Sequence, residues 1–140
     1  AEIGVRTGRT TFHILDNNPM CEMYAIDKDI TQFFNDDVKE KYGHRLKTYE
    51  TDSRVSPDFV ADASLDFFFI DASHTYKNVR KDLLAWIPKL SHDGWMMGHD
   101  INYPSVHEAV MDVIGFYEVG PDNVWLARRD KTYPGLKEKK

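Results

Sequence analysis

Short apolar runs alternate with amphipathic segments along this chain. The runs predict β-strands, and the segments between them carry apolar residues three and four positions apart, which is typical of helices that bury one face. The clearest strand is Leu65–Asp71, whose stretch Phe67–Ile70 is unbroken, as in a strand buried on both faces. The other expected strands are Ala1–Val5, Met20–Asp27, Arg45–Asp52, Trp95–Asp100, Phe116–Val119 and Val124–Arg129.

Helices are expected between these strands, over Thr10–Leu15, Pro57–Ala63 and Ser105–Ile114, and between Leu65–Asp71 and Trp95–Asp100. A further helix is expected after the second strand. Asp29 has the features of its N-cap, and Gln32, three residues later, would complete a capping box. The apolar stripe of this helix runs to Tyr42, where Gly43 suits a helix end.

Strands that alternate with helices predict an α/β domain with a mostly parallel sheet and right-handed crossovers. The last two strands lie too close in the sequence for a helical crossover, so we expect them to pair antiparallel. We expect one domain over residues 1–130 and a polar tail over residues 131–140. The first residue is Ala, not Met, and lies at the edge of a strand, so we expect an N-terminal segment to be missing from this sequence.

The composition is that of a soluble globular chain, with 41% hydrophobic and 29% charged residues among 140. The net charge of −5 offers nothing to nucleic-acid phosphate or to an anionic membrane surface. No apolar stretch approaches the ~20 residues that a membrane span needs. The single cysteine, Cys21, fits a reducing, cytoplasmic compartment. We expect no nucleic-acid or membrane partner, and a homodimer is left open.

Ligands bind beyond the carboxyl ends of the strands in a sheet of this kind. Each loop expected there carries an acid or a glycine turn: Gly4–Thr10, Asp27–Asp29, Asp52–Ser53, Asp71–Tyr76 and Gly98–Tyr103. The first loop presents backbone N–H groups at a helix N-terminus. Arg6 stands where a dinucleotide-binding loop has the glycine that admits a pyrophosphate. Asp27 ends the next strand, where a carboxylate accepts both hydroxyls of a ribose, so we expect a nucleoside ligand without a diphosphate.

Two stretches of the sequence resemble a known family. EIGVRTGRT followed by YAID resembles the first two motifs of class I S-adenosylmethionine-dependent methyltransferases. FFIDASHTYKNVRKDLLAWIPKLSHDGWMMGHD is similar to the signature of the family-24 small-molecule methyltransferases (Methyltransf_24), IDG-x-H-x-Y…D…W…L-x-x-G-G…HD. Ala72 replaces the glycine after the first Asp, and Asp93 replaces the first glycine of the pair. Pattern and resemblance imply a Rossmann-like three-layer α/β/α sandwich, with a mostly parallel seven-stranded sheet and an antiparallel last strand.

The resemblance implies that S-adenosylmethionine is the cofactor and indicates which residues bind it. The acid of the first motif and the glycine loop would surround the methionine part: Glu2, Gly4, Val5, Arg6 and Gly8. Asp27 would hold the ribose, and Asp52, with Ser53 beside it, would read the adenine edge. Asp71 would close the pocket under the methionine part or a metal. Arg6 could pair with the cofactor's carboxylate or point into solvent.

The charges of the candidate residues agree with that implication. S-adenosylmethionine is a net cation, because it carries a sulfonium and an ammonium against one carboxylate. A pocket lined by Glu2, Asp27, Asp52 and Asp71 favours such a cation and would repel a diphosphate.

Asp71, His74, His99 and Asp100 are expected at the ends of two neighbouring central strands. An aspartate on one strand end and an acidic pair on the next resembles the divalent-metal site of catechol-type O-methyltransferases, here Asp71, His99 and Asp100. Oxygen ligands suit Mg²⁺. The His99 nitrogen shifts the expectation toward Mn²⁺, Fe²⁺ or Zn²⁺, or toward no metal. The alternative is that His74 and His99 hydrogen-bond across the pocket floor and position loops.

Methyl transfer from a sulfonium needs an aligned nucleophile and, for a hydroxyl acceptor, a base. Histidine is the usual general base near neutral pH, so His99 and His74 are the candidate bases, with His99 preferred because it adjoins Asp100, and Asp71 completes the candidate catalytic set. We therefore expect an S-adenosylmethionine-dependent methyltransferase that methylates oxygen or nitrogen of a small molecule. A non-catalytic nucleoside-cofactor binding domain is one alternative. An NAD-linked oxidoreductase is another, although it would have to accommodate Arg6 and the acidic pocket.

Overall fold

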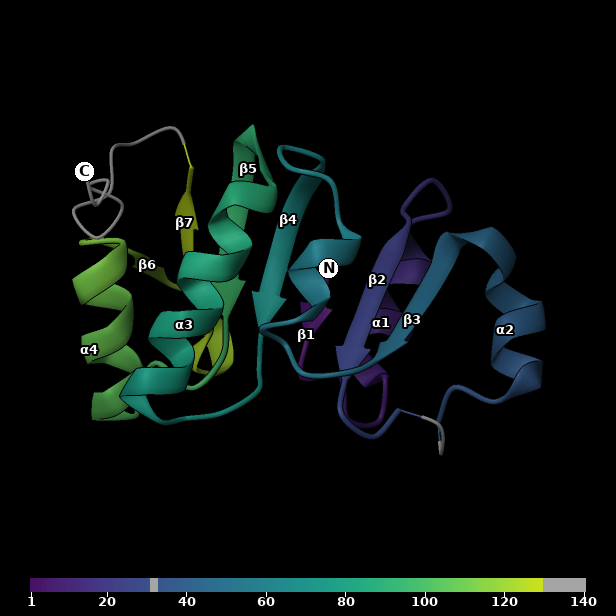
Figure 1. Cartoon of the computed structure of the whole chain (residues 1–140), viewed down its shortest axis with the longest axis horizontal. Helices are drawn as coiled ribbons and strands as arrows, with labels where there is room; N and C mark the ends of the chain where they lie inside the picture. The colour runs from purple at the N-terminus through teal and green to yellow at the C-terminus, as the bar shows by residue number, and fades with distance from the viewer. Residues whose placement is uncertain (31–32, 130–140) are drawn as a thin grey trace.

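The computed structural model describes residues 1–30 and 33–129, so the expected tail over residues 131–140 lies outside the described residues. The described strands form one sheet in the order β3-β2-β1-β4-β5-β7-β6 (Figure 1). Neighbouring strands from β3 to β5 are parallel, whereas β7 is antiparallel to both β5 and β6. The strands are β1 Glu2–Ile3, β2 Met23–Asp27, β3 Leu46–Glu50, β4 Leu65–Ile70, β5 Leu90–Gly98, β6 Glu118–Val119 and β7 Trp125–Arg128.

Helices lie on both faces of the sheet, which confirms the predicted Rossmann-like three-layer fold. Figure 1 shows α3 in front of the β4–β5 part of the sheet, with α4 beside it, and α1 behind β2. The helices are α1 Arg9–Asn17, α2 Asp36–Tyr42, α3 Tyr76–Trp86 and α4 Pro104–Val113, and short 3₁₀ turns cover Gly43–Arg45, Ser56–Phe59, Ile87–Lys89 and Pro121–Asn123. Among the described residues, none of these helices has the length and apolar character needed to span a membrane.

The strand order reverses between β1 and β4, and this reversal positions the candidate site. Successive strands run outward from β1 through β2 to β3, and outward on the other side from β4 to β5. The loops that follow β1 and β4 therefore leave the sheet next to each other but in opposite directions. A ligand crevice is expected at such a switch point in an open α/β sheet.

The main core lies between the sheet and the helices α3 and α4. Phe68 and Ile70 of β4 are buried in it, but Phe67 and Phe69, which point to the opposite face, are only partly buried. The prediction that the whole run Phe67–Ile70 is buried on both faces is therefore wrong for two of its four residues. On the opposite face, Phe67 packs against the cluster of Leu15, Met23 and Tyr42.

The start of α2 differs from the prediction. The helix begins at Asp36, and its N-cap is Asn35, whose side-chain oxygen accepts a hydrogen bond from the Val38 N–H at 3.1 Å. Asp29 instead lies in the turn after β2, where its own N–H donates to Asp27. Gln32, the expected partner in the capping box, lies outside the described residues. Gly43 ends the helix as predicted, with a φ of 53°.

Other boundaries also differ. The expected helix Pro57–Ala63 is a single 3₁₀ turn at Ser56–Phe59. The strand expected at Trp95–Asp100 begins earlier, at Leu90, and ends at Gly98. Its first residue pairs with Leu65 across a register shift in β4, an irregularity that alternation of apolar residues does not reveal.

Replacing Asn35 with Ala tests the observed helix start. Loss of an Asn N-cap costs about 1 kcal/mol, so we expect Asn35→Ala to lower the free energy of unfolding in urea at pH 7 by that amount. Asp29→Ala is the matched control, because Asp29 is exposed and caps no helix, and it should change stability by less than about 0.5 kcal/mol. A larger loss for Asp29→Ala than for Asn35→Ala would contradict the assignment.

Candidate functional site

A pocket of about 390 Å³ lies beyond the carboxyl ends of β1, β2, β3 and β4, at the switch point of the sheet. Six of the residues predicted to bind the cofactor line it: Gly4, Arg6, Asp27, Asp52, Ser53 and Asp71. They come from four different loops, so the strand-end rule alone predicted their convergence. The other three predicted residues, Glu2 of β1 and Val5 and Gly8 of the glycine loop, do not line the pocket and are buried.

Gly4 allows the loop after β1 to lie directly against the end of β4. It has a φ of 87°, and a Cβ built on it would overlap the carbonyl oxygen of Asp71 and lie 2.7 Å from the Cα of Ala72. These neighbours are backbone atoms that cannot move aside. Only glycine therefore permits this approach of the two strand ends.

Asp27 is fixed at the pocket wall by backbone donors. The Arg6 N–H donates to Asp27 Oδ2 at 2.7 Å, and the Asp29 N–H donates to Oδ1 at 3.3 Å. Arg6 adopts a left-handed conformation with a φ of 50° to make this contact. Since each carboxylate oxygen has two lone pairs, Asp27 can still accept two further hydrogen bonds, as from the two hydroxyls of a ribose.

The three predicted residues that do not line the pocket fix the shape of the glycine loop. Glu2 is 2% exposed and accepts a short hydrogen bond from the Thr11 hydroxyl, which ties the first turn of α1 to β1. Burial raises the pKa of Glu2 to about 7, and the hydrogen bonds from Thr11 offset only part of this shift. Val5 packs in a small apolar cluster. Gly8 is the N-cap of α1, where a Cβ would lie 2.6 Å from the Phe12 ring.

The carboxylate of Asp52 is paired with two nearby cationic side chains, Arg54 and Lys28. Oδ1 accepts from the backbone N–H of Arg54 at 3.0 Å and from its Nε at 2.6 Å. Oδ2 pairs with the Arg54 guanidinium and with Lys28 Nζ, the latter at 3.1 Å. The hydrogen bonds from Arg54, and then that from Lys28, hold the pKa of Asp52 well below its usual range.

These cations correct the predicted charge of the pocket. Glu2 is not on its wall, and the wall carries three cationic side chains, Arg6, Lys28 and Arg54, in addition to its carboxylates. Of the four acids expected to line the pocket, Asp27, Asp52 and Asp71 do so, and the repulsion of a diphosphate stays a prediction. Sequence reasoning assigned no role to Lys28 and Arg54, which lie one residue beyond Asp27 and two residues beyond Asp52.

Two side chains of helix α3, one turn apart, form hydrogen bonds with the loop after β3. Ser53 Oγ donates to Asp82 Oδ1 at 2.6 Å, and Trp86 Nε1 donates to the Ser53 carbonyl at 3.0 Å. Asp82 is only 2% exposed and lies on the buried side of α3 together with Val79 and Trp86, yet it lines the pocket. The sequence signal that could have identified Asp82 as a pocket residue is the position of an aspartate within the apolar stripe of a helix.

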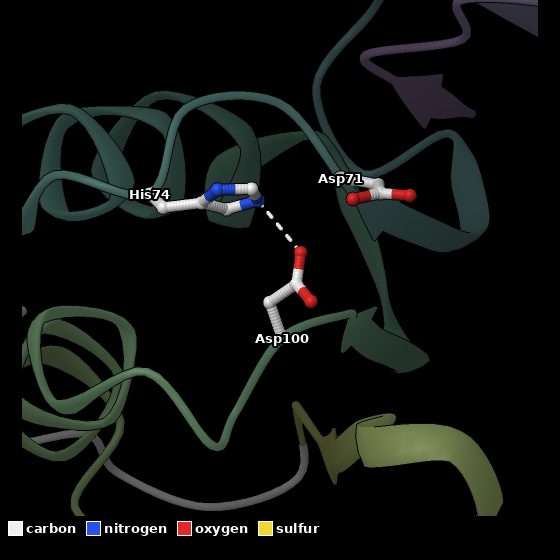
Figure 2. Close-up of side chains that lie close together, drawn as sticks. All are labelled: Asp71, His74 and Asp100. Atoms are coloured by element: carbon white, nitrogen blue, oxygen red, sulfur yellow. Dashed lines mark ion pairs between the residues drawn. The ribbon is translucent and has the colours of Figure 1, made fainter.

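A second cluster of polar side chains adjoins the pocket at Asp71. Ligating atoms of Asp71, His74 and Asp100 all lie within 4.8 Å of one another, and Figure 2 shows His74 and Asp100 facing each other with Asp71 beside them. His74 Nε2 lies 2.6 Å from Asp100 Oδ2. The predicted group contained His99 in place of His74. His99 instead places Nδ1 3.0 Å from the other oxygen, Oδ1 of Asp100.

The backbone and the rings around this cluster hold it in place. Asp100 has a φ of 60°, a left-handed conformation that is uncommon outside glycine. The His74 ring stacks on Tyr103 with centroids 5.0 Å apart, and the Ser105 hydroxyl donates to the His74 carbonyl at 2.5 Å. Burial raises the pKa of Asp71, while the nearby His99 opposes the shift.

The strand order, the glycine loop and the acids that follow β2 and β4 define the fold of the class I methyltransferases. Solved structures with this fold include CalS11, a TDP-rhamnose 3'-O-methyltransferase of calicheamicin biosynthesis, at 18% identity over 93% of this chain and 71% of that one, with a TM-score of 0.66. The chain belongs to the Methyltransf_24 family of methyltransferase domains, whose family model matches residues 1–101.

Two further solved structures carry ligands. The 1,6-didemethyltoxoflavin-N1-methyltransferase of Burkholderia thailandensis, solved with S-adenosylhomocysteine, is 14% identical over 91% of this chain and 68% of that one, with a TM-score of 0.66. MycE, solved with Mg and S-adenosylhomocysteine, is 17% identical over 93% of this chain and 45% of that one, with a TM-score of 0.64. No protein with a curated description matches the sequence. The family match therefore identifies this chain as a methyltransferase domain, and the structural likeness confirms its fold.

The raised pKa of Glu2 predicts a pH-dependent stability. The native state holds the Glu2 proton to about pH 7, whereas the unfolded chain releases it near 4.5, so the free energy of unfolding falls as pH rises between these values. Glu2→Gln lacks this titration. We expect the stability of Glu2→Gln relative to the parent, measured by urea unfolding, to increase by about 3 kcal/mol from pH 4.5 to pH 8. A difference that stays constant over this range would show that Glu2 titrates normally.

Proposed function

We propose that the pocket beyond β1–β4 binds S-adenosylmethionine, and that the Asp71–His74–Asp100 cluster is where its methyl group meets the acceptor. One observation carries this proposal: Asp71 both lines the pocket and belongs to the cluster. A donor whose ribose lies on Asp27 and whose methionine part extends past Gly4 therefore ends at the cluster. The family membership supports the same donor.

The methionine part of the donor would lie over the glycine loop. Arg6 lines this part of the pocket, where its guanidinium is available to the donor's carboxylate. Asp71 is suited to the positive end of the donor, the ammonium and sulfonium. The donor's net positive charge is then met by Asp27 and Asp71 on the two central loops.

His74 is the preferred base for a hydroxyl acceptor. Its Nε2 faces Asp100, which fixes the ring and leaves Nδ1 to accept a proton. The acceptor oxygen attacks the methyl carbon as the bond from carbon to sulfur breaks, the sulfonium becomes a thioether, and the acceptor's proton passes to His74. The sequence favoured His99, but the side chain of His74 is more exposed, at 44% against 32%, and is therefore more accessible to an acceptor.

The same three side chains have the donor set for a divalent cation. Two carboxylates and one imidazole suit Mn²⁺, Fe²⁺ or Zn²⁺, and the carboxylates alone suit Mg²⁺. When bound there, the metal would lower the pKa of an acceptor hydroxyl. In that arrangement His74 is a ligand, and His99 is the histidine that remains to accept a proton.

The partner that we propose is a small-molecule acceptor. A cytoplasmic location is part of the same proposal, because the lone, partly buried Cys21 is compatible with a reducing compartment.

Donor binding tests the role of Asp27. We expect calorimetry to show binding of S-adenosylhomocysteine, and Asp27→Ala to weaken it about 10- to 100-fold because two charge-assisted hydrogen bonds to the ribose are lost. Asp29→Ala is the matched control from the same turn and should bind as the parent does. Saturable binding of NAD without binding of S-adenosylhomocysteine would contradict the proposal.

Turnover tests the role of His74. With an acceptor found in a panel of hydroxylated small molecules, we expect His74→Gln to lower kcat about 10²- to 10⁴-fold while donor affinity is kept. Rates of the parent should be equal with and without EDTA. A rate lost in EDTA and restored by Mg²⁺ or Mn²⁺ would make His74 a metal ligand instead of the base. Donor binding without any turnover would indicate a non-catalytic binding domain.

A further inference from the structure

Asp82 is a buried carboxylate on the wall of the pocket beyond β1–β4, and only one of its two oxygens has a hydrogen-bond donor. It is 2% exposed and lines the pocket from α3. Its Oδ1 accepts from Ser53 Oγ at 2.6 Å. Within residues 1–30 and 33–129, no donor reaches Oδ2.

Leaving a buried carboxylate oxygen without a donor is unfavourable. Two cations, Arg54 and Lys28, lie near Asp82. Both form their ion pairs with Asp52 and none with Asp82. Burial accordingly raises the pKa of Asp82. A ligand that brings an N–H donor to this wall would satisfy the free oxygen.

Asp52, the acid predicted to read the adenine, has no such free capacity. Two donors of Arg54 reach Oδ1, and the Arg54 guanidinium and Lys28 reach Oδ2. A neutral amine would have to displace a charged partner to bind there. Ser53, between Asp52 and Arg54 on the pocket wall, has a backbone N–H for which no acceptor is found among the described residues.

These features match the edge of adenine, which presents an N–H donor at its exocyclic amine next to an acceptor at ring nitrogen N1. We propose that Asp82, and not Asp52, accepts the hydrogen bond from the exocyclic amine of the donor's adenine, with the Ser53 N–H available to N1. This inference rests on the proposed binding of S-adenosylmethionine. In this arrangement Asp52 positions Arg54 and Lys28 on the pocket wall through its ion pairs with them.

The test compares S-adenosylhomocysteine with S-inosylhomocysteine, in which an oxygen acceptor replaces the exocyclic amine and ring nitrogen N1 carries a hydrogen. We expect the parent protein to prefer the adenosyl compound about 10- to 100-fold in calorimetry, because two acceptors would otherwise face each other. Asp82→Asn should reduce this preference about tenfold, since its amide can donate to the inosyl oxygen, whereas the mismatch between N1–H and the Ser53 N–H remains in every variant. Asp52→Asn should keep the preference of the parent.

Two control variants distinguish recognition of the adenine by Asp82 from an effect on folding and from an effect on the position of the loop after β3. Asp58→Asn makes the same chemical change at an exposed residue away from the pocket wall, and it should keep both affinities. Ser53→Ala removes the hydrogen bond to Asp82 but leaves the carboxylate, so the preference for adenine should persist. If Ser53→Ala instead lost the preference as fully as Asp82→Asn does, Asp82 would only position the loop, and the inference would be overturned.

The outcomes also distinguish the inference from the proposed function. If the parent binds neither compound, the proposed function fails and the inference falls with it. If the parent binds both equally, or if Asp52→Asn loses the preference, the inference alone is overturned. This last comparison decides the matter even if Asp82→Asn does not fold.

Discussion

The packing of Gly4 against the backbone of Asp71 and Ala72 is the contact on which the rest of the site depends. β1 and β4 are neighbours at the point where the strand order reverses, and their loops diverge there toward different helices. Because Gly4 has no Cβ, the two strand ends meet backbone to backbone. This close contact places Asp27, held by the glycine loop, and Asp71, at the end of β4, on the walls of one pocket.

Much of the fold could be predicted because it depends on regular patterns. Alternation of apolar runs with amphipathic segments gave the seven strands and the mostly parallel sheet, and the strand-end rule gave the loops that form the pocket. The boundaries were less predictable. Asp29 and Asn35 are both good N-cap residues, and only the turn after β2, where the Asp29 N–H donates to Asp27, decides between them.

The site was predictable at the level of loops but less so for individual side chains. Asp27, Asp52 and Asp71 were placed on the pocket correctly, but the sequence did not show that Arg54 and Lys28 would neutralise Asp52. Likewise, adjacency in the sequence favoured His99 as the partner of Asp100 in the metal group, whereas the fold brings His74 from another loop to the same carboxylate. Such pairings depend on side-chain direction, which spacing does not encode.

Asp71 belongs to the donor pocket and to the cluster beside it, so the two compartments share one charge. A molecule bound in either compartment changes the electrostatic environment that the other presents. Thermodynamic reciprocity then requires that a cosubstrate which tightens or loosens its neighbour's binding is itself tightened or loosened by the same factor. Coupling of this kind can act through a single carboxylate, without any movement of the chain.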